Sequence, residues 1–262
     1  MLAKVIFDDG EHKWIVLARD PNKPESVIDT NQFLIVSHGD ALMLDPGGTE
    51  VFPAVLAATS DTLDLTQITT FFASHQDPDV FSSLPLWLGL CPTAKAYVPK
   101  IWTGFVAHFG VEYVQSFVPI ADEGGSLPVG NRGKTLQMIP AHYCHASGNY
   151  SVYDPHAKIL FSGDIGAALL PDDAQDLYVQ DFEKHTQYMK GFHQRWMPSN
   201  EAKNAWVRRV RQLDIQQLCP QHGSIFRGEQ VKLFLDWLEA LEVGIAIQHV
   251  EPGTPTDPKA VR

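Results

Sequence analysis

Metal-binding side chains follow directly on a short apolar run in the segment 71–79, and this arrangement limits the possible folds more than any other feature of the chain. The run 68–73 is predicted to be a buried strand, and His75, Asp77 and Asp79 come after it at alternate positions. Three such side chains on a turn at the end of a strand can converge on one point. A single triplet could also be a solvated turn, so its interpretation depends on partners elsewhere in the sequence.

Three further candidates stand just past other apolar runs: His145, Asp164 and His222. An Asp or a His alone is more often a turn residue than a ligand. Six of them at the predicted ends of four strands make that explanation improbable for the set as a whole. We therefore predict a site for two metal ions, formed by strand-end loops gathered along one edge.

Strands lead in both halves of the chain, and helices follow them. The predicted strands are 4–7, 14–18, 33–37, 41–44, 68–73, 96–98, 136–141, 150–153, 158–162 and 218–220. The predicted helices are 51–58, 79–90, 102–109, 175–195, 201–212 and 228–241, and a polar, Gly-rich stretch is expected at 121–133. We expect one domain of the α/β (α+β) class at residues 1–250, with two sheets packed face to face and helices outside, and a loose Pro-rich tail at 251–262.

Charge and composition exclude several classes of protein. With 31 acidic against 20 basic residues the net charge is -11, which argues against a nucleic-acid or anionic-membrane surface. No apolar stretch approaches the roughly 18 residues that span a bilayer, and the sequence begins in a predicted strand rather than a secretory leader. The three cysteines, Cys91, Cys144 and Cys219, are widely spaced and suggest no disulfide framework. We expect a cytoplasmic protein.

The ligand set favours iron. It combines three imidazoles with three carboxylates, a mixture that suits iron or manganese, whereas thiolate-rich sets favour zinc. Two Fe(III) ions would carry more positive charge than three carboxylates neutralise, so the oxidised pair would gain from an added anion. A need for an added anion in the oxidised state is typical of a diiron site that binds dioxygen. Zinc or manganese remain alternatives, and a zinc site could recruit Cys144 and Cys219, although free cysteines more often pack as small apolar residues.

The candidate residues resemble a known fold family over nearly the whole chain. His75-x-Asp77-x-Asp79, His145, Ser162-Gly163-Asp164 and His222-Gly223 are similar in order and spacing to the metallo-β-lactamase fold, which implies an αββα sandwich of two mixed sheets with helices outside. Most hydrolases of that fold carry His-x-His-x-Asp-His in the first motif. Here Asp77 and Val80 replace the second and third His, and a carboxylate at the second position, usually Glu, is typical of flavodiiron proteins.

The His-Gln-Asp-Pro-Asp segment is most similar to that of stand-alone oxygen-binding diiron proteins, and the segment 160–164 resembles the bridging-aspartate segment of flavodiiron proteins. The resemblance implies that Asp164 bridges the two irons. It implies as ligands of the first iron His75, Asp77 and His145, and as ligands of the second Asp79 and His222. Because Val80 cannot coordinate, the second iron would keep an open position for a ligand.

Flavodiiron enzymes also carry a flavodoxin-like domain whose FMN feeds electrons to the irons. We find no phosphate-binding loop that opens a helix in the C-terminal part and expect no FMN in this chain. We therefore expect an O2- or NO-binding diiron protein that is an oxygen or redox sensor, or a reductase with an external electron donor. A signalling partner and a homodimer are compatible with either. If the protein is an enzyme, an oxidoreductase is favoured over a hydrolase.

Two alternatives use the same residues differently. A dinuclear metallohydrolase of an ester, thioester or phosphodiester would employ a metal-bridging hydroxide oriented by Asp79. A degenerate fold that serves only to bind proteins is the least favoured, because all six candidate ligands are intact. Fold alone does not decide among these chemistries.

The stretch 188–200 is rich in aromatic and Met side chains. The simpler interpretation is a helix that packs on the core. The alternative is a lid over the metals, in which Tyr188 and His193 would donate hydrogen bonds to a bound oxygen species and Met189 and Met197 would shield it. His38 and His142 are further histidines, and His145 is preferred over His142 as the ligand.

Overall fold

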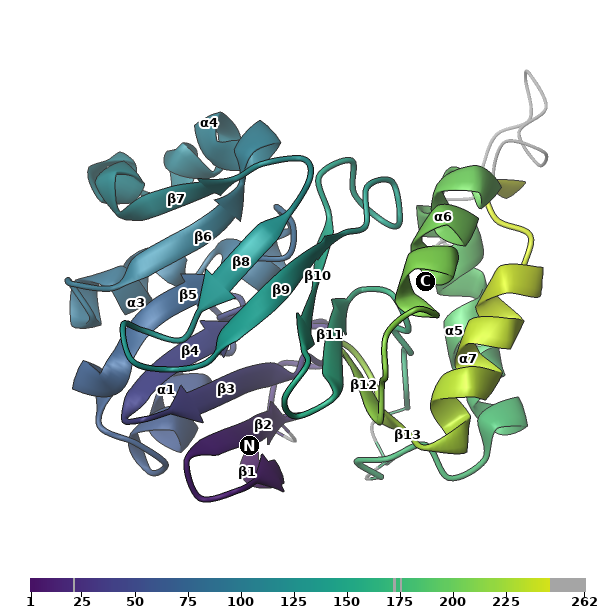
Figure 1. The fold of residues 1–262 in the computed structure, drawn as a ribbon, viewed down its shortest axis with the longest axis horizontal. Coiled ribbons are helices and arrows are strands. Elements are labelled where there is room, and N and C mark those ends of the chain that lie inside the picture. The colour runs from purple at the N-terminus through teal and green to yellow at the C-terminus, as the bar shows by residue number, and fades with distance from the viewer. Residues whose placement is uncertain (21, 172, 175, 246–262) are drawn as a thin grey trace.

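The computed structural model describes residues 1–20, 22–171, 173, 174 and 176–245. Over these residues the strands form one seven-stranded and one six-stranded sheet, and helices cover the outer face of each, as Figure 1 shows. The predicted α/β (α+β) architecture of two face-to-face sheets with helices outside is confirmed. The predicted tail at 251–262 lies outside the described residues, and the extent of a single domain over 1–250 stays a prediction.

The first sheet keeps its strands in the order in which they occur in the chain. They are β1 (Leu2–Asp8), β2 (His12–Ala18), β3 (Gln32–Ser37), β4 (Asp40–Leu44), β5 (Ile68–Phe72), β6 (Lys95–Pro99) and β7 (Phe117–Ile120). Pairs from β1 to β4 are antiparallel, and those from β4 to β7 are parallel. Because parallel strands end at the same edge of a sheet, the residues after β5 face an edge where loops converge.

The second sheet has the order β13 (Phe226–Arg227), β12 (Gln217–Pro220), β11 (Ile159–Gly163), β10 (Tyr150–Asp154), β9 (Thr135–Pro140) and β8 (Gly125–Pro128). Its neighbours are antiparallel except for β11 and β12, which are parallel. All residues of β10 and β11 are buried, as expected for strands covered on both faces. The parallel pair directs Asp164 and His222 toward the same edge.

Three apolar layers hold the four-layer arrangement together. The two sheets meet through side chains such as Phe33 of β3 and Phe161 of β11, whose ring centroids lie 5.5 Å apart. One outer layer joins the first sheet to α1 (Phe52–Ser60), α2 (Pro78–Phe81) and α3 (Leu84–Leu90). The other joins the second sheet to α5 (Phe182–Trp196), α6 (Asn200–Val210) and α7 (Glu229–Ala240), which lie together at the right of Figure 1.

The three helices on the second sheet have polar caps at their ends. The carboxylate of Asp181 accepts from the N–H of Lys184 at the start of α5, and the hydroxyl of Ser199 accepts from the N–H of Ala202 at the start of α6. Lys203 of α6 is 1% exposed, and its Nζ donates to three carbonyls at the C-terminal end of α7: Leu238 (2.6 Å), Glu239 (2.9 Å) and Leu241 (2.7 Å). This buried ammonium satisfies acceptors that the helix itself leaves open.

Several predicted elements differ from those observed. The predicted helix 79–90 is interrupted at Ser83, whose hydroxyl donates to the carbonyl of Gly47 (2.7 Å), and Pro85 removes an N–H donor from the next turn. The predicted helix 175–195 begins only at 182, because Tyr178 instead forms a bridge with Ile225. The predicted Gly-rich stretch 121–133 contains β8, which pairs with β9.

The predicted helix 102–109 is a series of short turns. These are η2 (Lys100–Trp102), α4 (Thr103–Val106) and η3 (Ala107–Phe109), and η4 (Val111–Ser116) follows; η1 (Leu65–Gln67) precedes β5. The strands β7 and β13 were not predicted, because two to four residues carry too little periodicity. Among the described residues no helix combines the length and the apolar character needed to cross a bilayer.

Candidate metal centre

Five segments bring the six predicted ligands to one edge of the two sheets. His75 follows β5, and Asp77 and Asp79 lie at the start of α2. His145 lies in the loop between β9 and β10. Asp164 and His222 come directly after β11 and just after β12. The first sheet therefore supplies one half of the set and the second sheet the other half.

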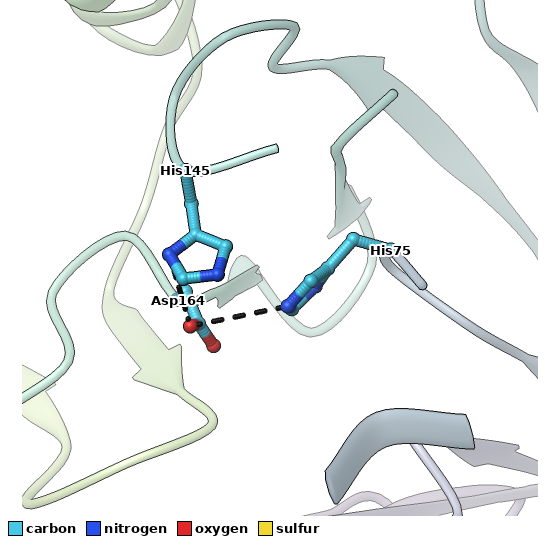
Figure 2. A group of neighbouring side chains, drawn as sticks. All are labelled: His75, His145 and Asp164. Carbon is cyan, nitrogen blue, oxygen red and sulfur yellow. Dashed lines mark ion pairs between the residues drawn. The ribbon is translucent and has the colours of Figure 1, made fainter. Parts of the chain in front are cut away.

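His75, His145 and Asp164 form the compact centre of this group, as Figure 2 shows. One ligand atom from each lies within 4.8 Å of the other two. The Asp164 Oδ2 atom is 3.9 Å from His75 Nε2 and 3.3 Å from His145 Nδ1. All three side chains are at most 5% exposed. Two imidazoles and a buried carboxylate thus point at a common space.

The other three candidates flank this centre on two sides. Asp77 Oδ2 lies 3.5 Å from His75 Nε2 and 2.9 Å from His145 Nε2. On the other side, His222 Nε2 lies 3.3 Å from Asp79 Oδ2 and 3.4 Å from Asp164 Oδ1. The six side chains are therefore brought together in two groups, and Asp164 contacts both. This division matches the predicted sharing between two metals, and the ligand roles themselves stay a prediction.

Buried polar atoms without partners show that these residues suit cations. His75 Nε2, His145 Nδ1 and Asp164 Oδ1 are shielded from solvent, and among the described residues they form ion pairs of 3.3 to 3.9 Å but no hydrogen bond of good geometry. Buried polar atoms in folded proteins are nearly always paired, and leaving one unpaired costs about 1–3 kcal/mol. Metal ions in this space would satisfy all three atoms at once.

The charges of the group are strongly coupled. Burial alone would lower the pKa of His75, but the carboxylates of Asp164 and Asp77 outweigh burial and raise it to about 9. His222 behaves likewise: burial opposes protonation, and Asp164 and Asp79 hold its pKa well above the usual value. Burial would raise the pKa of Asp77 and of Asp164, yet the neighbouring imidazoles hold both below the normal range. Without metal, protons on the imidazoles thus balance the negative charge of the carboxylates, which metal ions would otherwise balance.

Hydrogen bonds behind the group fix which ring nitrogen faces it. Ser74 donates to both oxygens of Asp45, from its N–H (2.7 Å) and its hydroxyl (2.6 Å). The Ser74 oxygen can then accept from His75 Nδ1 (2.8 Å), which leaves Nε2 directed at the centre. His222 Nδ1 donates to the carbonyl of Asp29 (2.8 Å), which leaves its Nε2 free in the same way. Such bonds set the tautomer and orientation of metal-binding histidines.

The loop that carries His145 has an unusual backbone. His145 has a φ of 113° and Tyr143 a φ of 61°, a region that side chains other than glycine rarely adopt. Hydrogen bonds hold the loop closed, from the Ala141 N–H to the Asn149 carbonyl and from Asn149 Nδ2 to the Cys144 carbonyl (both 2.8 Å). Local strain of this kind clusters at functional sites.

Two aromatic side chains that sequence reasoning missed cover His145. The Phe192 ring is stacked on the His145 ring at 5.6 Å between centroids, and the Trp196 ring lies at 5.2 Å. Both belong to α5, and Trp196 is 52% exposed. Their spacing of four residues was a usable signal, because it places them on one face of a helix.

Tyr188 and His193 make other contacts than those expected. His193 is fully buried, its Nδ1 donates to the Met189 carbonyl (2.8 Å), and its Nε2 accepts from the N–H of Gly166 (2.9 Å). Burial lowers its pKa to about 4, so the ring is neutral. His193 therefore supports the loop after Asp164. Tyr188 packs against the core on the helical side. A hydrogen bond from either residue to a bound oxygen species stays a prediction.

The cysteines and the remaining histidines do not join the group. Among the described residues the potential metal-binding cluster contains no cysteine. Burial raises the pKa of Cys144 to about 12 and raises that of Cys219 too. His142 Nε2 donates to the Asp122 carbonyl (2.8 Å), and His38 lies 4.0 Å from Glu11. The zinc–thiolate alternative is therefore disfavoured.

The metal-free protein should lose stability as the pH rises from about 6.5 to about 9. The pKa of His75 is raised from 6.5 to about 9, so its stabilising contribution is complete below the lower value and is lost as the pH rises through the upper one. Metal binding requires neutral imidazole, so affinity should increase over the same window. Thermal unfolding of metal-free and zinc-loaded protein across this window measures both effects. An equal pH dependence of the two forms would contradict the expectation.

Comparisons with known proteins identify a matching family and similar solved structures. A family model described as "ODP family beta lactamase" matches residues 28–223. The structure of the apo state of chemotaxis sensor ODP from T. denticola is 42% identical, covers 94% of this chain and 98% of that chain, and has a TM-score of 0.84. The structure of the peroxy diiron species of chemotaxis sensor ODP is 40% identical, with coverages of 95% and 99% and a TM-score of 0.83.

Two more distant relatives are less similar: one shows only a shared fold, and the other matches less than half of this chain. A variant of the flavo di-iron protein from Thermotoga maritima is 20% identical, with coverages of 91% of this chain and 61% of that chain and a TM-score of 0.74. An uncharacterised protein of Methanocaldococcus jannaschii is 29% identical over 124 residues, which are 45% of this chain and 30% of that relative. The match thus spans less than a third of this curated relative. The predicted resemblance to the β-lactamase fold is confirmed.

Proposed function

Because the chain belongs to the ODP family of β-lactamase-fold proteins, we propose that it is a non-haem diiron protein that binds dioxygen and acts as an oxygen sensor. Two structures of chemotaxis sensor ODP, one of them a peroxy diiron species, match this chain at 40% and 42% identity over nearly its full length. Similarity of this extent supports a shared chemistry as well as a shared fold. The observation in this chain that supports it is the cluster of His75, His145 and Asp164, which Asp77, Asp79 and His222 flank at 2.9 to 3.5 Å.

Each side chain has a part in holding the two irons. His75, Asp77 and His145 form one group, Asp79 and His222 the other, and Asp164 contacts both. When bound, the irons would supply the redox-active, electron-rich centre that reacts with O2 or NO. Val80, where hydrolases of the fold have a third His, is fully buried in the apolar layer below α2. It leaves the second group with fewer ligands, which favours a small external ligand.

The surroundings of the site favour a sensor over a rapid reductase. Phe192 and Trp196 lie over His145, whose side chain is 5% exposed. Turnover as a reductase would depend on electrons from a donor. Without a donor, the oxidised form of the protein would persist, and a signalling partner could recognise it. We place such a protein in the cytoplasm, and a homodimer is compatible with this function.

Metal analysis and an absorption spectrum test the proposal. Protein purified without oxygen should contain iron in both positions, and a visible charge-transfer band should appear when air is admitted. A band that persists supports a sensor, and a band that decays when a reductant is added supports a reductase. Protein that holds only zinc in its native host, with no spectral change in air, would overturn the diiron proposal and direct attention to hydrolysis.

A further inference from the structure

We propose that Asn31 is a positioning residue that holds His222 in the metal centre from a segment nearly the whole chain away in sequence. The segment 29–31 leads into β3 and lies against the residues on both sides of His222. The proposal deepens the proposed function, because it assigns to this segment the support of the second metal position.

Asn31 contacts the backbone on both sides of His222. Its side chain is 1% exposed, and Nδ2 donates to the carbonyls of Pro220 (3.2 Å) and Gly223 (2.8 Å). Its backbone N–H donates to the carbonyl of Gln221 (2.6 Å). One residue therefore fixes the chain before and after His222, so the position of that Cα is set by a segment of the first sheet.

The neighbouring residue fixes the ring itself. The carbonyl of Asp29 accepts from His222 Nδ1 (2.8 Å), which determines the orientation of the imidazole. Asp29 is in turn held by Arg19, whose guanidinium donates to the Asp29 carboxylate and to the carbonyl of Ala174. Asn31 and Asp29 thus control two different degrees of freedom of His222, namely its backbone position and its ring orientation.

The opposite side of the His222 turn leaves little room for adjustment. Gly223 has a φ of 86°, and a Cβ placed there would lie 2.7 Å from the Cβ of Ala168 and 2.9 Å from its carbonyl oxygen. The Ala168 N–H donates to the His222 carbonyl (3.2 Å). The turn is therefore wedged between Ala168 and the segment 29–31. If the Asn31 contacts were lost, the turn that carries His222 could move only toward the segment 29–31, because Ala168 blocks the opposite direction.

Replacement of Asn31 by Ser tests the proposal, because it keeps the backbone bond while the single hydroxyl proton of Ser can satisfy at most one of the two carbonyls. Gln217→Ser is the matched control, since Gln217 is also a buried amide, on the adjoining strand β12, and its Nε2 donates to the distant Ile6 carbonyl (3.0 Å) without approaching His222. Calorimetric titration of the metal-free protein with Zn(II), and separately with Fe(II), gives the affinity of each position. A crystal structure of the variant gives the place of the His222 ring.

We expect Asn31→Ser to weaken one of the two metal positions by about 10–100-fold, as is usual when a partner of a metal-binding histidine is lost, and to leave the other unchanged. Gln217→Ser should bind both metals normally.

Equal affinities in Asn31→Ser and wild type, or an unmoved His222 ring, would overturn the proposal. If Asn31→Ser does not fold, Asn31→Asp, which keeps the shape of the side chain but has no Nδ2 donor, should weaken the same position, and no weakening would equally overturn the proposal. The two proposals can fail separately. If the zinc titrations give the expected result but the iron-loaded protein shows no spectral change in air, the oxygen-sensor proposal is refuted and the role of Asn31 is not.

Discussion

Replacement of Asp164 by Asn is expected to abolish iron binding at both positions and to remove any oxygen-dependent absorption band. The Asp164 carboxylate is 4% exposed and lies 3.3 to 3.9 Å from the nearest nitrogens of His75, His145 and His222. The amide keeps the shape and removes the negative charge that both groups share. Loss of a single supporting partner already costs about 10–100-fold in metal affinity, so loss of the shared ligand should cost more. Metal analysis and absorption spectra measure the result.

Asp79→Asn provides the graded comparison for this experiment. Asp79 contacts His222 (3.3 Å), and its side chain is 34% exposed, so its loss should weaken the second position and spare the first. Iron retained at full occupancy in Asp164→Asn would show that Asp164 does not bridge. Equal loss in both variants would show that the two positions fill as one unit.

Replacement of Lys203 by Met is expected to destabilise the fold by about 2–4 kcal/mol, without any direct effect on the metal centre. The ammonium donates to three carbonyls at the end of α7, at 2.6 to 2.9 Å, and Met has a similar length with no donor. Three buried acceptors would lose their partner, together with a positive charge that favours a helix C-terminus. Chemical denaturation of the metal-free protein gives the difference in free energy of unfolding.

Lys232→Met on α7 is the matched control for Lys203. Lys232 is exposed, and its replacement should change the free energy of unfolding by no more than about 0.5 kcal/mol. If the two variants were equally stable, the three hydrogen bonds of Lys203 would contribute nothing net. Wild-type metal stoichiometry in Lys203→Met would separate its effect from that of the ligand variants.

The sheets and the six candidate ligands could be predicted because both depend on short-range patterns. Apolar runs bounded by turn residues mark most of the strands, and the spacing His75-x-Asp77-x-Asp79 fixes three ligands on one turn. The parallel pairing of β11 with β12 then brings Asp164 and His222 to that turn. Each of these inferences uses residues that are neighbours in sequence or at the end of one strand.

The remaining features depend on contacts that no local pattern encodes. The break before α3 results from Ser83 bonding to Gly47, far back in the chain. The amphipathic helix α5 was recognised, but which of its side chains would face His145 depends on the angle at which it packs, so Phe192 and Trp196 were missed. Asn31 was not singled out from the sequence, because its partners at 220–223 are distant in sequence.

The division of the ligands between the two halves of the chain determines when the centre can assemble during synthesis. A ribosome adds about 5–20 residues per second, so His222 follows His75 by roughly 7–30 s. Until then a nascent chain contains His75, Asp77, Asp79, His145 and Asp164 but lacks the His222 contact of Asp79 and Asp164. The complete centre can therefore form only after His222 has been synthesised and the two sheets have packed together.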